Sequence, residues 1–515
     1  MSRVPSPVSR RLLVANRGEI AVRIFRACRD LGIETVAVYS DADRAAPHVA
    51  AADYAVRLGP APASESYLSV PALLDAARRT AATLVHPGYG FLAESADFAR
   101  ACEGAGLTFV GPSPAAVEAM GTKTTSRVLM ERAGVPVVPG MTRPARDAGD
   151  LALFGRSAGY PILLKAAAGG GGKGMRRVDS EGDVAAAFER ASAEAQASFG
   201  DGSIYAERLL ERPRHVEVQI AADRLGHRIA VGERECSIQR RHQKVVEESP
   251  SPVVGPELRA RLFAAATAAA DAVAYDSCGT VEFLLAEDGS FYFLEMNTRL
   301  QVEHPVTEEV WGVDLVTEMI RAALGEPLSF GNDAPVPRGH AIECRVYAED
   351  PARGFSPSPG VIERLRLPQG PGVRNDVGIE AGSTVPIDYD PMLGKLVVSG
   401  RDRAQAIARL SRALEEYEIA GVETTLPLFR RLVADADFRA GRFHTQWLDG
   451  WLPVQDWGER EPTEEETLFA AVSLALDRSA APIAPASTAS RWSHAVRREG
   501  LRVPLPAPGR SGARR

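Results

Sequence analysis

Strand-like and helix-like segments alternate over residues 11–120, and this alternation limits the possible folds more than any other feature of the chain. Apolar runs at residues 12–15 and 35–39 flank a stretch, residues 18–31, in which apolar side chains recur at helical spacing. Parallel strands need crossover connections, so regular alternation of this kind predicts a parallel sheet covered by helices. We therefore predict an α/β domain over residues 1–120.

The rest of the chain divides by composition into three further units. Most residues with catalytic chemistry lie within residues 121–330. Residues 337–451 begin rich in strand signals and become helical at residues 403–416, so the chain as a whole is predicted to be α/β, or α+β overall. Residues 452–515 are rich in Ala, Pro, Ser and Arg; a single helix is expected at residues 463–478, and residues 479–515 can bury little apolar surface. We predict that residues 452–515 form a tail that docks on a partner and takes no part in chemistry; a disordered tail without function is the alternative.

A glycine-rich turn follows a predicted strand at residues 161–165. Four consecutive glycines occupy residues 169–172, and Lys173 comes next. Glycines expose backbone N–H groups that can surround phosphate oxygens without interference from a Cβ atom. Lys165 ends the preceding strand and favours a nucleotide site. No GK[ST] sequence opens a helix here, so this is not a Walker A loop, and a flexible hairpin turn is the alternative.

Residues 280–297 predict a β-hairpin, with Asp288-Gly289 as its two-residue turn. Pairing outward from that turn sets Glu282 opposite Glu295, and like charges in this position destabilise a sheet. A divalent cation between them would remove the repulsion, and Asn297 follows on the same face. We therefore predict a Mg²⁺ site, since Mg²⁺ prefers oxygen ligands, and expect Glu282→Ala to stabilise the metal-free fold slightly. Two solvated carboxylates are the alternative.

Polar residues continue to alternate after Asn297, at Arg299, Gln301 and Glu303. If the chain stays extended, all of them point to one side and form a polar row leading away from the metal. An arginine close to a metal site is a good anion clamp, and a terminal glutamate is a candidate base. An edge strand facing water is the alternative interpretation.

Lysine is rare in this chain: only five of the 60 Lys and Arg residues are lysines. Where arginine fills most basic positions, a remaining lysine is a candidate for a site that needs a compact ammonium group. On this ground Lys123, Lys165, Lys173 and Lys244 are candidate functional residues. Lys244 ends a basic run at residues 239–244, and such a run on its own could equally be solvated surface.

Composition excludes several classes of protein. A net charge of -7 argues against a nucleic-acid binder, which needs a basic face. Residues 1–10 lack the apolar core of a signal peptide, and the longest apolar stretch of the tail, residues 468–476, is too short to span a membrane. The five cysteines are far apart and include no CxxC pair, which fits scattered thiols in a reducing cytoplasm. We therefore expect a cytoplasmic protein with no nucleic-acid or membrane partner.

Taken together, several segments closely resemble the biotin carboxylase family of the ATP-grasp superfamily. The matching segments are ANRGEI at residues 15–20, HPGYGF at 86–91, GGGGKGM at 169–175, ECSIQRRHQK at 235–244, EMNTRLQVEHP at 295–305 and ECR at 343–345. They follow the family's order from about residue 10 to residue 450. The resemblance implies an N-terminal α/β domain, an ATP-grasp domain with a mobile lid, and a mixed C-terminal domain that completes the site. Three alanines at 166–168, where many members have glycine, are a mild departure in the lid.

The resemblance also implies a role for each matching residue. ATP would be bound by Lys123, Lys165, Gly171, Gly172, Glu207, Arg208, Leu209, Leu210, His215, Gln239, His242, Glu282 and Glu295. Glu282, Glu295 and Asn297 would hold Mg²⁺ or Mn²⁺, in agreement with the hairpin argument. Bicarbonate would be held by Arg299, Gln301 and Val302, with Glu303 as its base. Lys244 would steady carboxyphosphate, and Arg345 would bind biotin and stabilise its enolate.

The implied reaction is ATP- and bicarbonate-dependent carboxylation of biotin through carboxyphosphate. No methionine precedes a lysine, whereas a biotinylated lysine normally lies in a Met-Lys-Met sequence. The biotin is therefore expected on a separate carrier protein; the other expected partners are a carboxyltransferase subunit and, in a homodimer, a second copy of the chain. The rival interpretations are a ligase of the carbamoyl phosphate type and a non-catalytic scaffold subunit. The final acceptor, an acyl-CoA or pyruvate, is not indicated by the sequence.

Overall fold

The structure of the chain is a computed structural model that describes residues 10–121, 123–167, 175–331, 333 and 335–457. None of the helices in these residues is long and apolar enough to cross a membrane. Gly171, Gly172 and most of the tail lie outside the described residues, so the predictions made for them stay predictions.

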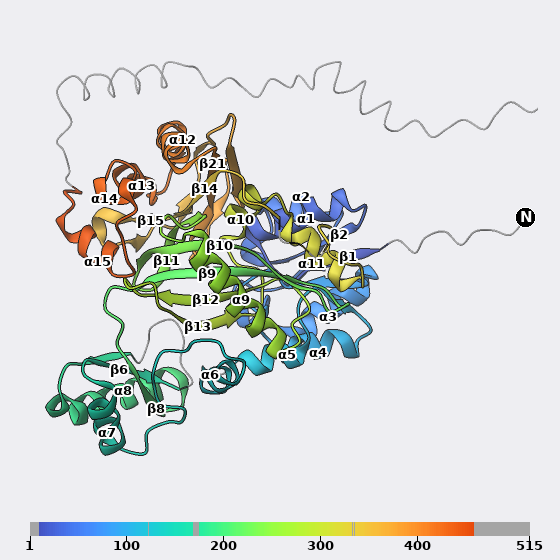
Figure 1. Cartoon of the computed structure of the whole chain (residues 1–515). Helices are drawn as coiled ribbons and strands as arrows, with labels where there is room; N and C mark the ends of the chain where they lie inside the picture. The colour runs from blue at the N-terminus through green and yellow to red at the C-terminus, as the bar shows by residue number, and fades with distance from the viewer. Residues whose placement is uncertain (1–9, 122, 168–174, 332, 334, 458–515) are drawn as a thin grey trace, which may run out of the picture. The chain divides into compact units, whose positions relative to one another are not determined.

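The N-terminal sheet contains five parallel strands in the order β3-β2-β1-β4-β5 (Figure 1). The strands are β1 (Arg11–Val14), β2 (Glu34–Ser40), β3 (Tyr54–Gly59), β4 (Leu84–His86) and β5 (Thr108–Phe109). The helices of this part are α1 (Gly18–Asp30), α2 (Pro47–Ala51), α3 (Val70–Thr80) and α4 (Ala96–Gly104). The predicted parallel α/β arrangement is confirmed.

The loops after β1 and β4 leave this sheet side by side, because the strand order reverses at β1. Asn16 fastens them together by donating from Nδ2 to the carbonyl oxygens of Pro87 at 2.8 Å and Tyr89 at 2.6 Å. Gly88 has a φ of +65°, and a Cβ atom there would lie 2.9 Å from Asn16 Nδ2, so both the conformation and the space require glycine. Ligands of open α/β sheets bind at this type of edge.

A second sheet contains eight antiparallel strands in the order β13-β12-β9-β10-β11-β14-β21-β19. They are β9 (Arg214–Ala222), β10 (Arg228–Arg240), β11 (Gln243–Ser249), β12 (Gly279–Leu285), β13 (Phe291–Asn297), β14 (His340–Tyr347), β19 (Val373–Val377) and β21 (Met392–Gly400). The helices α9 (Pro256–Ala272), α10 (His304–Trp311) and α12 (Arg403–Glu416) pack against it. The last of these confirms the helix predicted at residues 403–416.

This sheet runs without a break across the predicted boundary at residues 330–337. β11 belongs to the second predicted unit and β14 to the third, yet they pair in register from Val246↔Cys344 to Ser249↔Ala341. The polar residues of the two units therefore lie on one continuous surface.

A smaller sheet holds the residues that precede the glycine-rich segment. It contains β6 (Ile162–Ala166), β7 (Arg176–Val178) and β8 (Ile204–Arg208), with α7 (Ala148–Ala158) and α8 (Val184–Phe199) packed on it (Figure 1). The remaining helices are α5 (Pro114–Met120), α6 (Lys123–Arg132), α11 (Leu315–Ala323), α13 (Leu426–Leu432), α14 (Ala436–Ala440) and α15 (Trp447–Trp451). The short strand pairs are β15 (Glu349–Asp350) with β16 (Ser356–Pro357), β17 (Gly360–Val361) with β20 (Thr384–Val385), and β18 (Arg364–Arg366) with β22 (Glu418–Ala420).

The hairpin of β12 and β13 has the predicted pairing of Glu282 with Glu295, but its predicted two-residue turn is wrong. Ala286 N donates to Ser290 O at 2.8 Å, which leaves a three-residue loop ending at Gly289 with a φ of +79°. This is the three-residue loop with a left-handed glycine. It moves the register by one residue near the turn, and an irregularity next to Glu282 moves it back.

The polar row predicted from residue 295 to residue 303 is not one extended strand. β13 ends at Asn297, and Glu303 occupies the position before α10, whose first turn contains Pro305. Proline suits the first turn of a helix because its missing N–H would be unpaired there. The polar side chains still meet, but a bend of the backbone brings them together rather than the alternation of a strand.

Candidate active site

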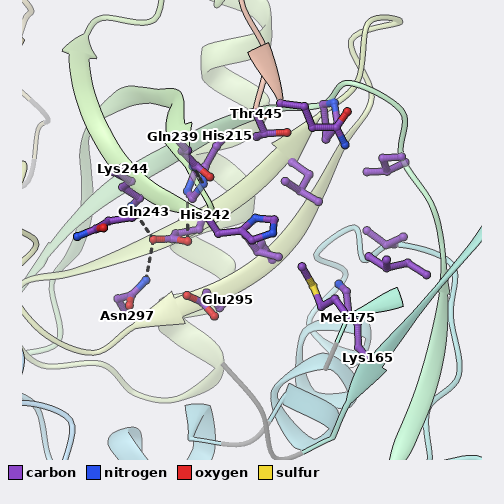
Figure 2. Close-up of a pocket in the computed structure, with 18 of the residues that line it drawn as sticks. Lys165, Met175, His215, Gln239, His242, Gln243, Lys244, Glu295, Asn297 and Thr445 are labelled. Atoms are coloured by element: carbon purple, nitrogen blue, oxygen red, sulfur yellow. Dashed lines mark hydrogen bonds and ion pairs between the residues drawn. The ribbon is translucent and has the colours of Figure 1, made fainter. Parts of the chain in front are cut away.

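One face of the eight-stranded sheet gathers the predicted site residues. Neighbouring strands set Glu282 directly opposite both Glu295 and Glu217, and Glu217 opposite Arg234. Residues directly opposite in a ladder share a face, so these charged groups form one buried polar layer. Figure 2 shows His215, Lys244, Glu295 and Asn297 around one end of a pocket, with Lys165 on β6 and Met175, the residue before β7, at the other end.

The layer is centred on Lys244, near the start of β11. Its Nζ atom lies 2.5 Å from Glu217 Oε2, 2.8 Å from Glu282 Oε1 and 2.6 Å from Glu303 Oε1. Burial alone would lower the pKa of Lys244, but the three carboxylates more than offset it and raise the pKa well above its ordinary value. Lys244 is therefore a permanent cation, and an arginine would be too wide for a position shared by three carboxylates.

Glu303 is fully buried and lies between two cations. Its second oxygen, Oε2, accepts from Arg345 Nη2 at 2.8 Å. Burial and the neighbouring Glu217 act to raise the pKa of Glu303, but Lys244 and Arg345 outweigh them and hold it below its ordinary value. Glu303 is thus an ionised carboxylate at neutral pH, as a base must be.

Arg299 is held by partners from two parts of the chain. Its guanidinium donates to Asn297 Oδ1 and Gln301 Oε1, both at 2.9 Å. Its Nε atom donates to Glu94 Oε2 at 3.0 Å, and Glu94 also accepts from the Thr298 backbone N–H at 3.2 Å. These contacts aim the guanidinium without the extended strand predicted from the sequence.

A cavity of about 420 Å³ lies over this layer, and most of the predicted residues line it. The predicted residues in its lining are Lys165, Glu207, Arg208, Leu209, Leu210, His215, Gln239, His242, Lys244, Glu282, Glu295, Asn297, Arg299, Gln301, Val302 and Arg345. Glu303 lies behind the lining, in contact with Lys244 and Arg345. Lys123 begins α6.

The end of the cavity near the smaller sheet has its own ion-pair cluster. Glu207 pairs with Lys165 and with Arg127, whose Nη1 lies 2.9 Å from Glu207 Oε1. Burial would raise the pKa of Glu207, but the two cations lower it below its ordinary value. The cluster therefore holds the side chain of Lys165 at the cavity wall, where an anionic ligand could bind it.

The tight turn between β10 and β11 brings His242 to the cavity. Arg240 pairs with Gln243, so Arg241 and His242 form a two-residue loop, and both have a positive φ, of 50° and 67°. This is the conformation of a type I′ turn, which residues other than Gly and Asn rarely adopt. The basic run at residues 239–244 is therefore part of the cavity and not only solvated surface.

Glu282, Glu295 and Asn297 offer a set of oxygen atoms that fits a divalent cation of the Mg²⁺ type. The two carboxylates are partners across β12 and β13, and Asn297 lies two residues beyond Glu295. In the structure the charge of Glu282 is balanced by Lys244 and by His215 Nε2, which lies 3.2 Å from Glu282 Oε2. Burial would lower the pKa of His215, but Glu282 outweighs it and the pKa is raised to about 9.

Several residues of the site escaped the sequence predictions. Glu217 and Arg234 are completely buried and joined at 2.5 Å, and Glu247 binds Arg345 from behind. Glu217 could have been found, because it lies two residues after His215 on the same strand. Glu94 could not, since its partner Arg299 is 205 residues away in the sequence.

A second cavity, of about 490 Å³, adjoins the first. Its lining includes the loops fastened by Asn16, notably Tyr89, and also Tyr389. Four residues line both cavities: Gln243, Arg299, Val302 and Arg345. The arrangement therefore suits two ligands that react across Arg299 and Arg345, with Glu303 beside the point of contact.

Comparison with family models and known proteins gives consistent matches along the chain. Residues 8–117 match the biotin carboxylase N-terminal domain, residues 122–330 the ATP-binding domain of the carbamoyl-phosphate synthase L chain, and residues 343–450 the biotin carboxylase C-terminal domain. A pyruvate carboxylase subunit of Methanothermobacter thermautotrophicus is 50% identical over 456 residues, which are 88% of this chain and 93% of that protein. The biotin carboxylase of Halalkalibacterium halodurans is 49% identical over 446 residues, 87% of this chain and 98% of that protein.

Among solved structures, a similar one is the biotin carboxylase domain dimer of Hydrogenobacter thermophilus 2-oxoglutarate carboxylase, bound to MgADP, ADP and bicarbonate. Its TM-score is 0.83 at 45% sequence identity, and the match covers 87% of this chain and 99% of that one.

Proposed function

The chain belongs to the biotin carboxylase family, and on that basis we propose that it uses ATP and bicarbonate to carboxylate a biotin carried by a separate protein. This is the first half-reaction of a biotin-dependent acyl-CoA or pyruvate carboxylase. The observation that carries the proposal is the meeting of two cavities at Arg299, Val302 and Arg345. A ligase of the carbamoyl phosphate type would share the nucleotide cavity, but it would have no use for Arg345 at a second one.

ATP would occupy the first cavity. Lys165, held by Glu207, would bind phosphate oxygens, and residues 208–210 would meet the adenine with their backbone. His215, Gln239 and His242 line the same cavity. Mg²⁺ or Mn²⁺ held by Glu282, Glu295 and Asn297 would offset the negative charge of the transferring phosphoryl group.

Bicarbonate would bind between Arg299, Gln301 and the backbone of Val302. Glu303 would remove its proton, and Arg299 would hold the resulting oxyanion in line with the γ-phosphate of ATP, so that the oxyanion attacks the γ-phosphorus and ADP leaves. Lys244, which contacts Glu303 at 2.6 Å, would then steady carboxyphosphate. Since Lys244 and Arg345 keep Glu303 ionised, the base is ready before bicarbonate arrives.

Biotin would enter the second cavity and meet Arg345. Carboxyphosphate gives CO₂ and phosphate, and the phosphate takes the proton from the ureido nitrogen of biotin. Arg345 would stabilise the enolate oxygen that forms, because a fixed guanidinium in a buried site stabilises developing negative charge. The deprotonated ureido nitrogen of biotin then attacks CO₂ and gives carboxybiotin.

The test of this function is turnover with free biotin. The purified protein should hydrolyse ATP slowly with Mg²⁺ and bicarbonate, and faster when biotin is added, with carboxybiotin as a product. ADP release and incorporation of labelled bicarbonate measure the two outcomes. ATP hydrolysis that needs no bicarbonate and ignores biotin would overturn the assignment.

We also propose that the chain works as a homodimer with a biotin carrier protein and a carboxyltransferase subunit, in the cytoplasm. A dimer is supported by the related Hydrogenobacter thermophilus domain, which is described as a dimer. A reducing compartment is supported by the cysteines, all five of which are buried and free.

The tail should matter for assembly and not for chemistry. Trp451 belongs to the described unit, because its ring stacks on Trp447 and its Nε1 donates to Asp435 at 2.9 Å. Truncation after Trp457 should therefore leave free-biotin turnover within about twofold, while weakening co-purification with the carrier or carboxyltransferase subunit. If the truncated enzyme folded but lost turnover, the tail would belong to the catalytic unit, and normal assembly would leave it without the role proposed.

A further inference from the structure

Two buried carboxyl groups face each other directly behind Arg345. Glu247 on β11 and Glu343 on β14 are cross-strand partners, and both side chains are fully buried. Cross-strand partners place their Cβ atoms about 5 Å apart on the same face of a sheet. Like charges at such a spacing in a dry interior repel strongly, so the two groups cannot both be ionised.

The contacts of the two groups are very unequal. Glu247 Oε1 accepts from Arg345 Nε at 2.6 Å and lies 2.5 Å from Nη2. By contrast, neither oxygen of Glu343 has a hydrogen-bond partner among the described residues. A buried carboxylate without a donor is very unstable, whereas one paired with a guanidinium is not. The single negative charge therefore belongs to Glu247 and the proton to Glu343.

The charged and titratable groups around Glu247 and Glu343 also favour a proton on Glu343 and a negative charge on Glu247. Burial raises the pKa of Glu343 well above its ordinary value; Lys395 and Arg345 act to lower it, Glu247 and Glu303 act to raise it, and burial decides the outcome. Burial also raises the pKa of Glu247, to about 7, against the pull of Arg345. The other groups that face the pair are Lys244, Glu303, Tyr89, Cys236, Cys344 and Tyr347.

We propose that Glu247 is the positioning residue for Arg345 and that Glu343 serves it as a neutral, proton-bearing neighbour. Among the described residues, the guanidinium of Arg345 then lies between two carboxylates, Glu247 behind it and Glu303 toward the first cavity. Glu343 lies two residues before Arg345 on the same face of β14. If it were ionised, it would add a third carboxylate and draw Arg345 away from the second cavity. The inference rests on the proposed role of Arg345 toward biotin.

The test compares matched carboxyl-to-amide variants in the free-biotin assay. Glu343→Gln copies the neutral state and should keep kcat/KM for biotin within about twofold, whereas Glu247→Gln should lower it about tenfold or more. The KM for ATP should stay within about twofold in both. In Glu247→Gln the repulsion is gone and Glu343 can ionise and partly replace the lost charge. The double variant should therefore be about threefold worse than Glu247→Gln alone.

The pH profile separates positioning from general stability. In the wild type, kcat/KM for biotin should fall as the pH drops through about 7, since protonated Glu247 no longer holds the guanidinium. That acid limb should persist in Glu343→Gln, shrink to about threefold in Glu247→Gln, where Glu343 still ionises, and disappear in the double variant. Glu247→Asp, which keeps the charge, should recover part of the loss and keep the limb. Thermal unfolding of each variant shows whether it is folded.

Three results would overturn the inference: a loss of more than about tenfold in Glu343→Gln, an acid limb of undiminished size in Glu247→Gln, or a double variant equal to Glu247→Gln. Arg345→Lys distinguishes this failure from failure of the proposed function. If Arg345→Lys leaves biotin kinetics unchanged, the role of Arg345 itself is wrong. If it lowers kcat/KM for biotin while Glu247→Gln does not, only the positioning by Glu247 is wrong.

Discussion

Glu303→Gln should abolish carboxylation while leaving ATP binding nearly intact. The amide keeps the shape of the side chain but cannot take a proton from bicarbonate, and loss of a general base typically costs about 10²–10⁴-fold in rate. Glu303 does not line the nucleotide cavity, so the Kd of ATP should change by less than about threefold. Carboxybiotin formation and nucleotide titration measure the two effects.

The variant also breaks a buried ion-pair network, so its fold must be checked. Glu303 joins Lys244 to Arg345, and removing one partner of a buried pair costs about 3–5 kcal/mol of stability. Glu349→Gln is a matched control, because Glu349 pairs with Arg240 at 3.0 Å and lines neither of the two cavities. The control should keep full turnover. If the carboxylation rate of a folded Glu303→Gln enzyme fell by less than about tenfold, a cost of about 1.4 kcal/mol, Glu303 would not be the general base.

Glu282→Ala should raise the Mg²⁺ concentration needed for half-maximal turnover by about tenfold or more, because it removes one of two opposed carboxylate ligands. A Mg²⁺ titration of ATP hydrolysis at fixed ATP measures this. Glu287→Ala on the same hairpin is the control, since Glu287 is exposed and its carboxylate lies 3.4 Å from an exposed Arg212. If Glu282→Ala needed no more Mg²⁺ than the wild type for half-maximal turnover, Glu282 would not be a metal ligand.

The structure reverses the expected effect of this variant on stability. From the sequence alone, removal of Glu282 is expected to relieve repulsion from Glu295 and stabilise the metal-free fold. In the structure Glu282 Oε1 instead accepts from Lys244 at 2.8 Å, Asn297 at 2.9 Å and Gln301 at 3.2 Å. Burial raises the pKa of Glu282, but Lys244 and His215 lower it well below its ordinary value. Glu282→Ala should thus destabilise the metal-free protein by about 2 kcal/mol, as measured by thermal or urea unfolding.

The hairpin also shows what a sequence can and cannot predict about register. The pairing of Glu282 with Glu295 was predicted correctly from an incorrect turn, because a longer loop and an irregularity in β13 shift the register in opposite directions. Turn residues reveal where a hairpin reverses, but the loop length depends on φ at single residues, such as Gly289. An irregularity inside a strand depends on packing and leaves no comparable signal.

Residues 299–303 illustrate a different limit. Alternating polar residues predicted an extended row, but the first turn of α10 follows immediately, and Pro305 was the local signal for it. The residues nevertheless meet, because Lys244, Glu94 and Glu282 bind them from distant parts of the chain. Which polar residues lie around the cavity could therefore be predicted from the sequence, whereas the contacts that orient them could not.

The pairing of β11 with β14 has a consequence for how the protein holds together. The border suggested by composition at residues 330–337 is crossed by backbone hydrogen bonds, by Arg345 bound to Glu247 and by His340 bound to Glu248 at 2.6 Å. Two pieces joined by a shared sheet unfold as one cooperative unit rather than as independent modules. A chain cut between α11 and β14 would yield fragments that fold only in each other's presence, and activity would return by complementation when the two are mixed.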